Sequence, residues 1–144
     1  MTGPTPDRYL PDDWTLPAVD EHSEAFFTSG ELLLERCPAC GHVQHPPQGV
    51  CVECQHVGTE RVAAEPVGTV VSATVVHHAL NPMLRERVPF NVVVVELRDH
   101  PHVRLVGNVL GVAGERVPIG TAVRGTWTAP LGEQAVRLLQ WEPT

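Results

Sequence analysis

All four cysteines of this 144-residue chain lie between residues 37 and 54, as two C-x-x-C pairs. Cys37 and Cys40 form the first pair, and Cys51 and Cys54 form the second. A C-x-x-C turn directs two sulfurs to one point, and two such turns complete the tetrahedron that Zn²⁺ prefers. Because four thiolates leave no coordination position for water or substrate, the pattern predicts a structural zinc site rather than a catalytic one.

Other interpretations of the cysteines remain open. Two disulfides would suit a secreted protein, but no apolar signal run precedes the domain, and the metal-like spacing suits a reducing cytoplasm. His42, His45 or His56 could replace a cysteine as a ligand, although four thiolates already complete the set. Gly41 supports a metal-binding turn, because the chain bends sharply after the first pair and glycine tolerates φ > 0.

Length and charge limit the remaining possibilities. A chain of 144 residues is one domain, or two very small ones that share an interface. A ribbon of about twenty residues cannot fold on buried apolar area alone, and zinc binding contributes on the order of 10 kcal/mol in such modules. The net charge of −7, with arginine as every basic residue, disfavours generic binding to nucleic acid or anionic membranes. No apolar run is long enough to span a bilayer.

The region before the cysteines has two parts. Four prolines predict an extended arm over residues 1–17, in which Trp14 and Leu16 either fold back onto the domain or dock on another subunit. Residues 18–29 are predicted to be helical, because Pro17 can begin the helix, acids follow early and Gly30 can end it. One helix face would carry an apolar stripe of Val19, Phe26 and Phe27 that packs on the ribbon or on a partner.

The rest of the chain reads as β-structure. Residues 32–34 predict a strand leading into the ribbon, Pro46-Pro47 holds the span between the cysteine pairs extended, and residues 60–67 predict the exit strand. From Gly68 onward, five strands with no required helix favour a small five-stranded barrel over a sandwich. In the first of them, alternation places Val70 on one face with Ser72, Thr74 and Val76. The five predicted strands are 69–77, 90–97, 103–110, 121–128 and 135–142.

Several short runs, taken in order, resemble a known family. They are Phe26-Phe27, Gly30-Glu31-Leu32, the two cysteine pairs with Pro46-Pro47 between them, the strand from Gly68 to Thr74, Pro89-Phe90-Asn91-Val92, Val95-Glu96-Leu97, Ile119-Gly120 and Trp141-Glu142-Pro143. Together they cover nearly the whole chain and resemble a bacterial and archaeal zinc-ribbon/OB-fold family associated with thiolases. The cysteines alone are common to many zinc ribbons, whereas their combination with the double proline and the β-strands is much more specific.

The resemblance implies a mainly β fold with three parts. These are an N-terminal arm and helix (1–30), a rubredoxin-like zinc ribbon (31–66) and a C-terminal five-stranded OB-fold barrel (67–144). It also implies a non-catalytic accessory subunit that binds a thiolase-superfamily enzyme as a hetero-oligomer in the cytoplasm and helps form its acyl-CoA site. Family settings include archaeal thiolase with hydroxymethylglutaryl-CoA synthase, and lipid-transfer-protein-like aldolases of steroid side-chain degradation.

Only the four cysteines carry over from the family as site residues. The chain departs from the family pattern at Gln48, where an arginine often follows the double proline. It departs again at residues 99–102, Asp-His-Pro-His, where a tight Glu-Gly-type turn is more usual. The first departure argues against a phosphate contact at that position, and the second concerns the hairpin between the second and third barrel strands.

Groups able to carry out covalent chemistry are scarce in the sequence. The cysteines are assigned to metal, no G-x-S-x-G motif occurs, and Ser72 falls in the middle of a strand. His77 and His78 end a strand and point to opposite faces, so at most one could serve a given site. His100 and His102 could bind adventitious metal but read as solvated loop residues.

Arginines suit the phosphates of CoA because the guanidinium group matches phosphate geometry. Arg85 and Arg87 lie in the long loop after the first barrel strand, a usual ligand edge of OB barrels, and Arg36 precedes the first cysteine pair. We therefore predict Arg85 and Arg87 as contacts for CoA phosphates, with Arg36 as a further candidate.

Three classes of function follow from the sequence. One is the accessory subunit of an acyl-CoA thiolase or aldolase. Another is a free-standing enzyme, although the sequence shows no group of acidic and basic side chains that would come together in an active site. The remaining class is a nucleic-acid-binding zinc-ribbon/OB module, which would need exposed aromatic side chains for base stacking. Phe90 is the one aromatic that the second and third barrel strands offer, while Trp127 and Trp141 belong to the last two strands.

Overall fold

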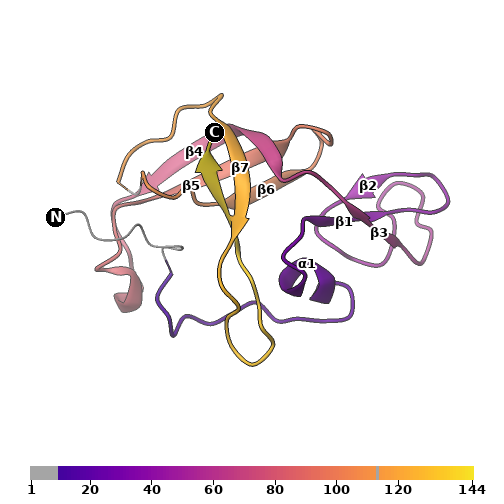
Figure 1. Cartoon of the computed structure of the whole chain (residues 1–144), viewed down its shortest axis with the longest axis horizontal. Helices are drawn as coiled ribbons and strands as arrows, with labels where there is room; N and C mark the ends of the chain where they lie inside the picture. The colour runs from indigo at the N-terminus through magenta and orange to yellow at the C-terminus, as the bar shows by residue number, and fades with distance from the viewer. Residues whose placement is uncertain (1–9, 113) are drawn as a thin grey trace.

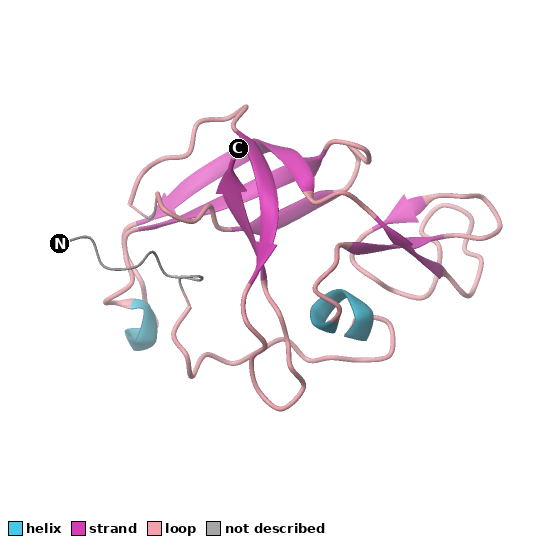
Figure 2. Ribbon diagram, in the orientation of Figure 1, coloured by secondary structure: helices cyan, strands magenta, loops and turns pink. Residues whose placement is uncertain are grey.

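The computed structural model describes residues 10–112 and 114–144, and it is mainly β, with 36% of residues in strands and 6% in helices. Two antiparallel sheets lie side by side, the smaller one at the right of Figure 1 and the larger one at its centre. Figure 2 shows how little of the chain is helical. The elements are α1 (Glu24–Thr28), β1 (Leu33–Arg36), β2 (Val43–Gln44), β3 (Glu60–Ala63), β4 (Val67–Val76), the 3-10 helix η1 (Pro82–Leu84), β5 (Phe90–Leu97), β6 (Arg104–Gly107), β7 (Ala122–Trp127) and β8 (Leu139–Pro143).

The smaller sheet is the ribbon, with strand order β2-β1-β3. Its central strand, β1, pairs with β2 through Glu35 and Gln44, and with β3 along its whole length. The chain then passes directly from β3 into β4, the first strand of the larger sheet. In the chain, the ribbon and the larger sheet are therefore joined by residues 64–66, which end at Pro66.

The larger sheet is a five-stranded barrel, with strand order β6-β5-β4-β7-β8. A parallel bridge between Val109 and Trp141 closes it, because Trp141 N–H donates to the Asn108 carbonyl and the Leu110 N–H donates to the Trp141 carbonyl. The fully buried Asn91 side chain strengthens this closure by bonding both the N–H and the carbonyl of Val109, at 2.7 and 2.8 Å. The predicted five-stranded OB-type barrel is confirmed.

A β-bulge in β4 overturns one detail of the predicted alternation. The pairing of β4 with β5 shifts between Val70 and Ser72, so that Val71 is an extra residue on the β4 side. Val70 is fully buried, whereas Ser72 is exposed and Ala73 packs against the core. The prediction that Val70 and Ser72 share a face is therefore wrong, because the bulge reverses the pattern beyond residue 71.

Several predicted elements are longer than the structure shows, including the strands predicted for residues 60–67 and 103–110, which form over Glu60–Ala63 and Arg104–Gly107. The helix predicted for residues 18–29 is formed only over residues 24–28, because the Asp20 carboxylate accepts the N–H groups of His22 and Ser23 and holds residues 20–23 in a turn. Gly30 ends the helix with φ of 72°, as predicted. The last strand begins at Leu139 rather than at 135, since Ala135 adopts a left-handed φ of 54° inside a turn.

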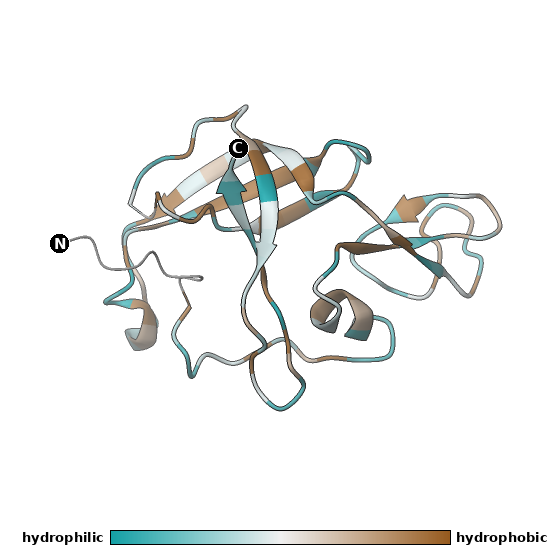
Figure 3. Ribbon diagram, viewed as in Figure 1, coloured by the Kyte–Doolittle hydropathy of each residue, from teal (hydrophilic) through white to brown (hydrophobic). Residues whose placement is uncertain are grey.

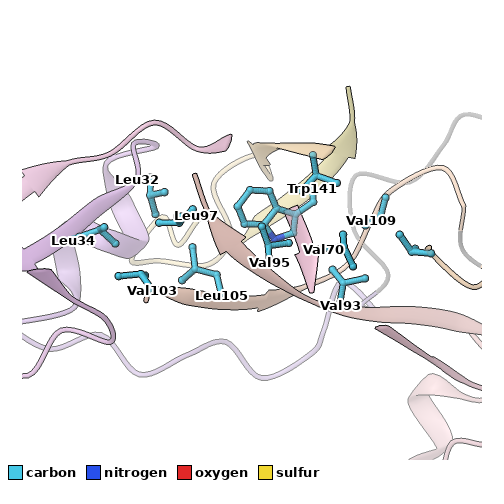
Figure 4. Packing of buried hydrophobic residues seen from close by; sticks show 12 residues of the cluster. Leu32, Leu34, Val70, Val93, Val95, Leu97, Val103, Leu105, Val109 and Trp141 are labelled. Atoms are coloured by element: carbon cyan, nitrogen blue, oxygen red, sulfur yellow. The ribbon is translucent and has the colours of Figure 1, made fainter. Parts of the chain in front are cut away.

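Ribbon and barrel share a single hydrophobic core. Leu32 and Leu34 come from the ribbon end of the molecule, and they lie beside Leu97, Val103 and Leu105 of the barrel in Figure 4. Further along the same cluster, Val70, Val93, Val95, Val109 and Trp141 fill the barrel itself. Figure 3 shows the corresponding hydrophobic segments along β4 and β5. Since the cluster is continuous, the ribbon is packed against the barrel rather than tethered to it.

The described part of the N-terminal arm folds back onto the chain. Leu16 packs on the loop between β7 and β8, where its Cδ1 would lie 2.9 Å from a Cβ added to Gly132. Trp14 is half-buried in a turn closed by its N–H and the Pro11 carbonyl. The first nine residues of the predicted arm lie outside the described residues.

Candidate metal centre

The two C-x-x-C turns bring the four cysteine sulfurs together, all within 4.8 Å of one another. Sγ of Cys37 lies 3.6 Å from Sγ of Cys54, and Sγ of Cys40 lies 3.6 Å from Sγ of Cys51. A disulfide needs about 2.05 Å, and all four cysteines are free, so the disulfide alternative is wrong. Four ligands at a Zn–S distance of about 2.3 Å stand about 3.8 Å apart in a tetrahedron, so the sulfurs fit Zn²⁺.

Each turn is built by main-chain hydrogen bonds around its cysteines. In the first, the Gly41 N–H donates to the Cys37 carbonyl and Gly41 has φ of 77°, as predicted for a sharp bend. In the second, the equivalent position is Gln55, which donates to the Cys51 carbonyl and takes a left-handed φ of 64°. Hydrogen bonding from the Cys40 main chain is the largest cause that lowers the pKa of the Cys37 thiol to about 6. The pKa of Cys40 is raised to about 12, because burial and the neighbouring sulfurs outweigh the hydrogen bond from the His42 main chain, and the pKa of Cys54 is raised as well. In the metal-free cluster the first thiolate therefore forms at Cys37.

A buried carboxylate that the sequence analysis did not single out holds the ribbon loops together. Glu35, at the centre of β1, is only 4% exposed. Its Oε1 accepts the Gly49 N–H at 2.8 Å and the Thr59 hydroxyl at 2.9 Å. Its Oε2 accepts the Gln48 N–H at 2.8 Å and the Gln44 amide at 3.0 Å. One side chain therefore joins β1 to β2, to the loop before the second cysteine pair and to the segment entering β3.

These bonds also decide the charge of Glu35. Burial opposes ionisation, but the N–H groups of Gln48 and Gly49 and the side chains of Thr59 and Gln44 outweigh it, so the pKa of this carboxyl lies below its usual range. Glu35 is consequently an anion that accepts four donors. Its one sequence signal was its place between the buried Leu34 and Cys37, where a charged residue needs partners.

None of the three histidines proposed as alternative ligands belongs to the sulfur cluster. The ring of His42 lies 5.3 Å from that of His102, across the contact between ribbon and barrel. The ring of His45 lies 4.7 Å from Phe26, and burial lowers the pKa of this histidine. His56 is exposed. His102 is not simply solvated, because its Nε2 lies 2.6 Å from the Val43 carbonyl and so ties the barrel loop to β2.

Comparison with known proteins agrees with this architecture. Residues 27–59 match the model described as the ChsH2 rubredoxin-like zinc ribbon domain, and residues 61–128 match that of the ChsH2 C-terminal OB-fold domain. A chain of the solved Ltp2-ChsH2(DUF35) aldolase superposes with a TM-score of 0.72 at 30% identity, covering 89% of this chain and 98% of that one. The chain belongs to the ChsH2 family. Its zinc is therefore structural, as in a rubredoxin-like ribbon with four thiolates, and the family resemblance drawn from the sequence is confirmed.

Two curated relatives of this ChsH2-family chain are longer than it. A probable enoyl-CoA hydratase alpha subunit of Thermomonospora curvata is 32% identical over 114 residues, which are 77% of this chain and 34% of that protein. The 3-oxo-4,17-pregnadiene-20-carboxyl-CoA hydratase alpha subunit of Mycobacterium tuberculosis is 36% identical over 143 residues, which are 96% of this chain and 43% of that protein. The chain thus spans between a third and a half of the length of these relatives.

The predicted CoA-contacting arginines lie away from the metal. Arg85 follows η1 and Arg87 lies two residues further, in the loop between β4 and β5, and both are exposed. Among residues 10–112 and 114–144, neither guanidinium forms an ion pair with an acid. Arg36, by contrast, lies 4.0 Å from Glu60.

The remaining candidates for chemistry are not brought together. Ser72, His77 and His78 are exposed along and after β4. In the described part of the chain, the serine and threonine hydroxyls that donate a hydrogen bond donate it to a carboxylate or a main-chain carbonyl, as Ser23 does to Asp20, and none bonds a histidine. Trp141, one of the two tryptophans of the last two barrel strands, is fully buried in the core. No helix in the described residues is long and apolar enough to cross a membrane.

Proposed function

We propose that this chain is a non-catalytic accessory subunit that binds a thiolase-superfamily enzyme acting on acyl-CoA thioesters. The observation that carries the proposal is the match to a chain of the Ltp2-ChsH2(DUF35) aldolase, which extends over 98% of that chain. The named relatives, both alpha subunits of CoA-ester hydratases, support a role as one component of an acyl-CoA-processing assembly. The steroid substrate named for one relative makes steroid side-chain degradation the first pathway to test.

The chemistry of this chain supports binding rather than bond-making. Its four cysteines are the proposed zinc ligands (Cys37, Cys40, Cys51 and Cys54), and their sulfurs are saturated when the metal is bound. The metal fixes the loops of the ribbon, the shared core fixes the ribbon against the barrel, and the result is a rigid surface for a partner. The reacting groups would then belong to the partner enzyme.

Arg85 and Arg87 are the proposed contacts for CoA phosphates at a site shared with the partner. They are exposed, they lie on one loop, and neither forms an ion pair with an acid of the described residues. We expect the double substitution of Arg85 and Arg87 by alanine to weaken CoA binding to the reconstituted complex by about tenfold. Arg98→Ala is the matched control, because Arg98 is also exposed but already lies 3.3 Å from Asp99. Unchanged CoA affinity in the double variant would remove these arginines from the site.

Co-expression with a thiolase-superfamily protein of the Ltp2 type tests the main proposal. We expect the two chains to co-purify, and we expect the partner to cleave or condense its acyl-CoA substrate only in the complex. The zinc-loaded chain alone should turn over no acyl thioester. Full activity of the partner without this chain, or turnover by this chain alone, would overturn the proposal.

A second candidate is a component of a CoA-ester hydratase, which the names of the two curated relatives favour. Because the matched region is less than half of each relative, their hydratase activity need not reside in it. Water addition to an enoyl-CoA, measured by loss of the conjugated thioester absorbance, distinguishes the candidates. Hydration by the complex, without carbon–carbon cleavage or formation, would favour the hydratase.

A further inference from the structure

A groove of about 470 Å³ lies outside the barrel, along the line where β6 and β8 diverge. We call it the seam groove. It is lined by β6 with the following Asn108, and by α1 with the loop at His45 and Pro46. Residues 138–140, at the start of β8, complete it. It is separate from the sulfur cluster and from the loop that carries Arg85 and Arg87.

The main chain of β6 is open toward this groove. β6 is an edge strand, paired with β5 on one side only, and the barrel is closed beyond it where Asn108 accepts a hydrogen bond from Trp141. Successive residues of a strand direct their main-chain N–H and carbonyl groups to alternate sides. The N–H and carbonyl groups of Arg104 and Val106 therefore point away from β5, to the same side as the carbonyl of Asn108. The Arg137 N–H, just before β8, donates at 2.7 Å to the Phe27 carbonyl and so holds α1 beside the segment that enters β8.

The lining of the groove is apolar and aromatic. Phe26 and Phe27 meet edge to face at 5.2 Å, and Leu138 and Leu139 also line the groove. Val106, on this edge strand, is 71% exposed. An exposed apolar side chain on an edge strand favours aggregation with other chains unless a partner covers it. Arg104 brings the one full charge to the lining, and it lies 3.4 Å from Glu96. Aromatic enrichment with few charges is the composition of an interface centre, and it is unsuited to a phosphate-bearing ligand.

Two polar atoms in residues that line the groove are unsatisfied. Gln140 is only 6% exposed, and its Oε1 has no hydrogen-bond partner among the described residues. Nδ1 of His45 is likewise buried and unpartnered in that part of the chain. Both residues belong to the groove lining, and a polar partner in the groove would reach these two atoms only after a side-chain movement that uncovers them.

We propose that the seam groove receives an extended apolar segment of the partner enzyme, which pairs its main chain with the β6 edge and inserts a side chain against Phe26 and Phe27. This inference rests on the proposed function and adds where the partner binds. A polypeptide supplies what the groove lacks, because it carries alternating N–H and carbonyl groups that can pair with the main chain of Arg104 and Val106. A second copy of this chain fits less well, since two copies would each bring a net charge of −7.

Val106 offers a direct test with a matched control. In the co-expressed complex with the Ltp2-type subunit, Val106→Glu should weaken the affinity at least about tenfold, because it places an unpaired charge in the interface. Ile119→Glu is the control, since Ile119 is also branched and is 67% exposed, but it lies outside the groove. Its affinity should stay within about twofold of the original. Val106→Pro should also weaken binding, because proline removes an N–H that the fold leaves unused on the edge strand.

Hydrogen exchange on the unmodified complex gives an independent measurement. The amides of residues 104 and 106 should gain protection when the partner binds, whereas the amide of Val57, at the far end of the ribbon, should not. Should Val106→Glu fail to fold, as judged by zinc content and thermal unfolding, this protection decides the question: its absence from residues 104 and 106 in the complex overturns the inference.

The other outcomes are distinguishable. A stable complex whose affinity is unchanged in Val106→Glu and Val106→Pro refutes the groove as the docking site but leaves the proposed function standing. Failure of the original chain to bind refutes the proposed function, and the docking inference with it. Dimerisation of the isolated chain that Val106→Glu abolishes would make the groove an interface between copies, which also overturns the proposal.

Discussion

Replacing Glu35 by glutamine should destabilise the zinc-loaded protein more than any surface charge substitution. The glutamine keeps the shape of the side chain but turns one acceptor oxygen into an NH₂ donor. At the Oε1 position this donor can be accommodated by the Thr59 hydroxyl, which can rotate to accept, but it leaves the Gly49 N–H without an acceptor. At the Oε2 position it faces two donors, the Gln48 N–H and the Gln44 amide. The first arrangement therefore costs less.

The magnitude follows from that arrangement. One unsatisfied buried N–H costs about 1–3 kcal/mol, and the bonds that remain lose the charge of their acceptor. We therefore expect Glu35→Gln to lower the free energy of unfolding by about 2–4 kcal/mol. Glu35→Ala should cost at least as much, because it leaves four donors facing a cavity.

Urea denaturation at neutral pH with saturating zinc measures these differences. Glu60→Gln is the control, because Glu60 is an exposed carboxylate on the neighbouring strand whose ion pair with Arg36 spans 4.0 Å, and it should change stability by less than about 0.5 kcal/mol. A loss below about 1 kcal/mol in Glu35→Gln would refute the reasoning, since it would mean that the buried carboxylate is not satisfying the ribbon loops.

Two further predictions concern packing and pH. Gly68→Ala should lower the free energy of unfolding, measured by urea denaturation, by about 1–3 kcal/mol, because a Cβ at this position would collide with the Glu96 main-chain carbonyl across the β4–β5 pair. Thr69→Ala, at the neighbouring exposed position, is the control and should change the free energy of unfolding by less than about 0.5 kcal/mol. Burial lowers the pKa of His45 in the folded protein below its ordinary value of 6.5. As the pH falls through 6.5, the unfolded chain therefore binds a proton at His45 before the folded protein does, and the free energy of unfolding decreases. His45→Phe should flatten the slope of unfolding free energy against pH in that window, and an unchanged slope would assign the dependence to another group.

Elements marked by local patterns could be predicted from the sequence. The four cysteines and Gly41 define the metal turns through spacing alone, and β5 spans residues 90–97 as predicted because a valine run bounded by Pro89 and polar residues has few alternatives. The barrel was predictable from the number of such runs. The division into domains at residues 30 and 66, and the roles of Arg85 and Arg87, stay predictions.

Features that depend on distant segments could not be predicted. Glu35 is buried by hydrogen-bond partners that lie between 9 and 24 residues further along the chain. No local sequence pattern indicates that these residues come together around it. The bulge at Val71 has the composition of a regular strand, so alternation misplaced Ser72. The helix was predicted too long because Asp20 was counted as a favourable first-turn acid, whereas its carboxylate instead stabilises a turn.

Zinc removal should weaken partner binding even though no cysteine lines the seam groove. The second cysteine loop is tied to Gln44, whose amide donates to the Val50 carbonyl and accepts the Val52 N–H at 2.8 and 2.9 Å. The next residue, His45, forms the groove wall and contacts Phe26. Loss of the metal frees both cysteine loops, and with them the residues that position this wall.

A chelator titration tests this coupling in the assembled complex. We expect zinc release to unfold the ribbon and to lower partner affinity by at least tenfold, while β4–β5 amides in the barrel keep more exchange protection than those of β1. Readdition of zinc should restore binding, which separates metal loss from irreversible damage. If the metal-free chain keeps its full affinity for the partner enzyme, the position of the groove wall does not depend on the ribbon. The β6 edge of the barrel alone would then bind the partner.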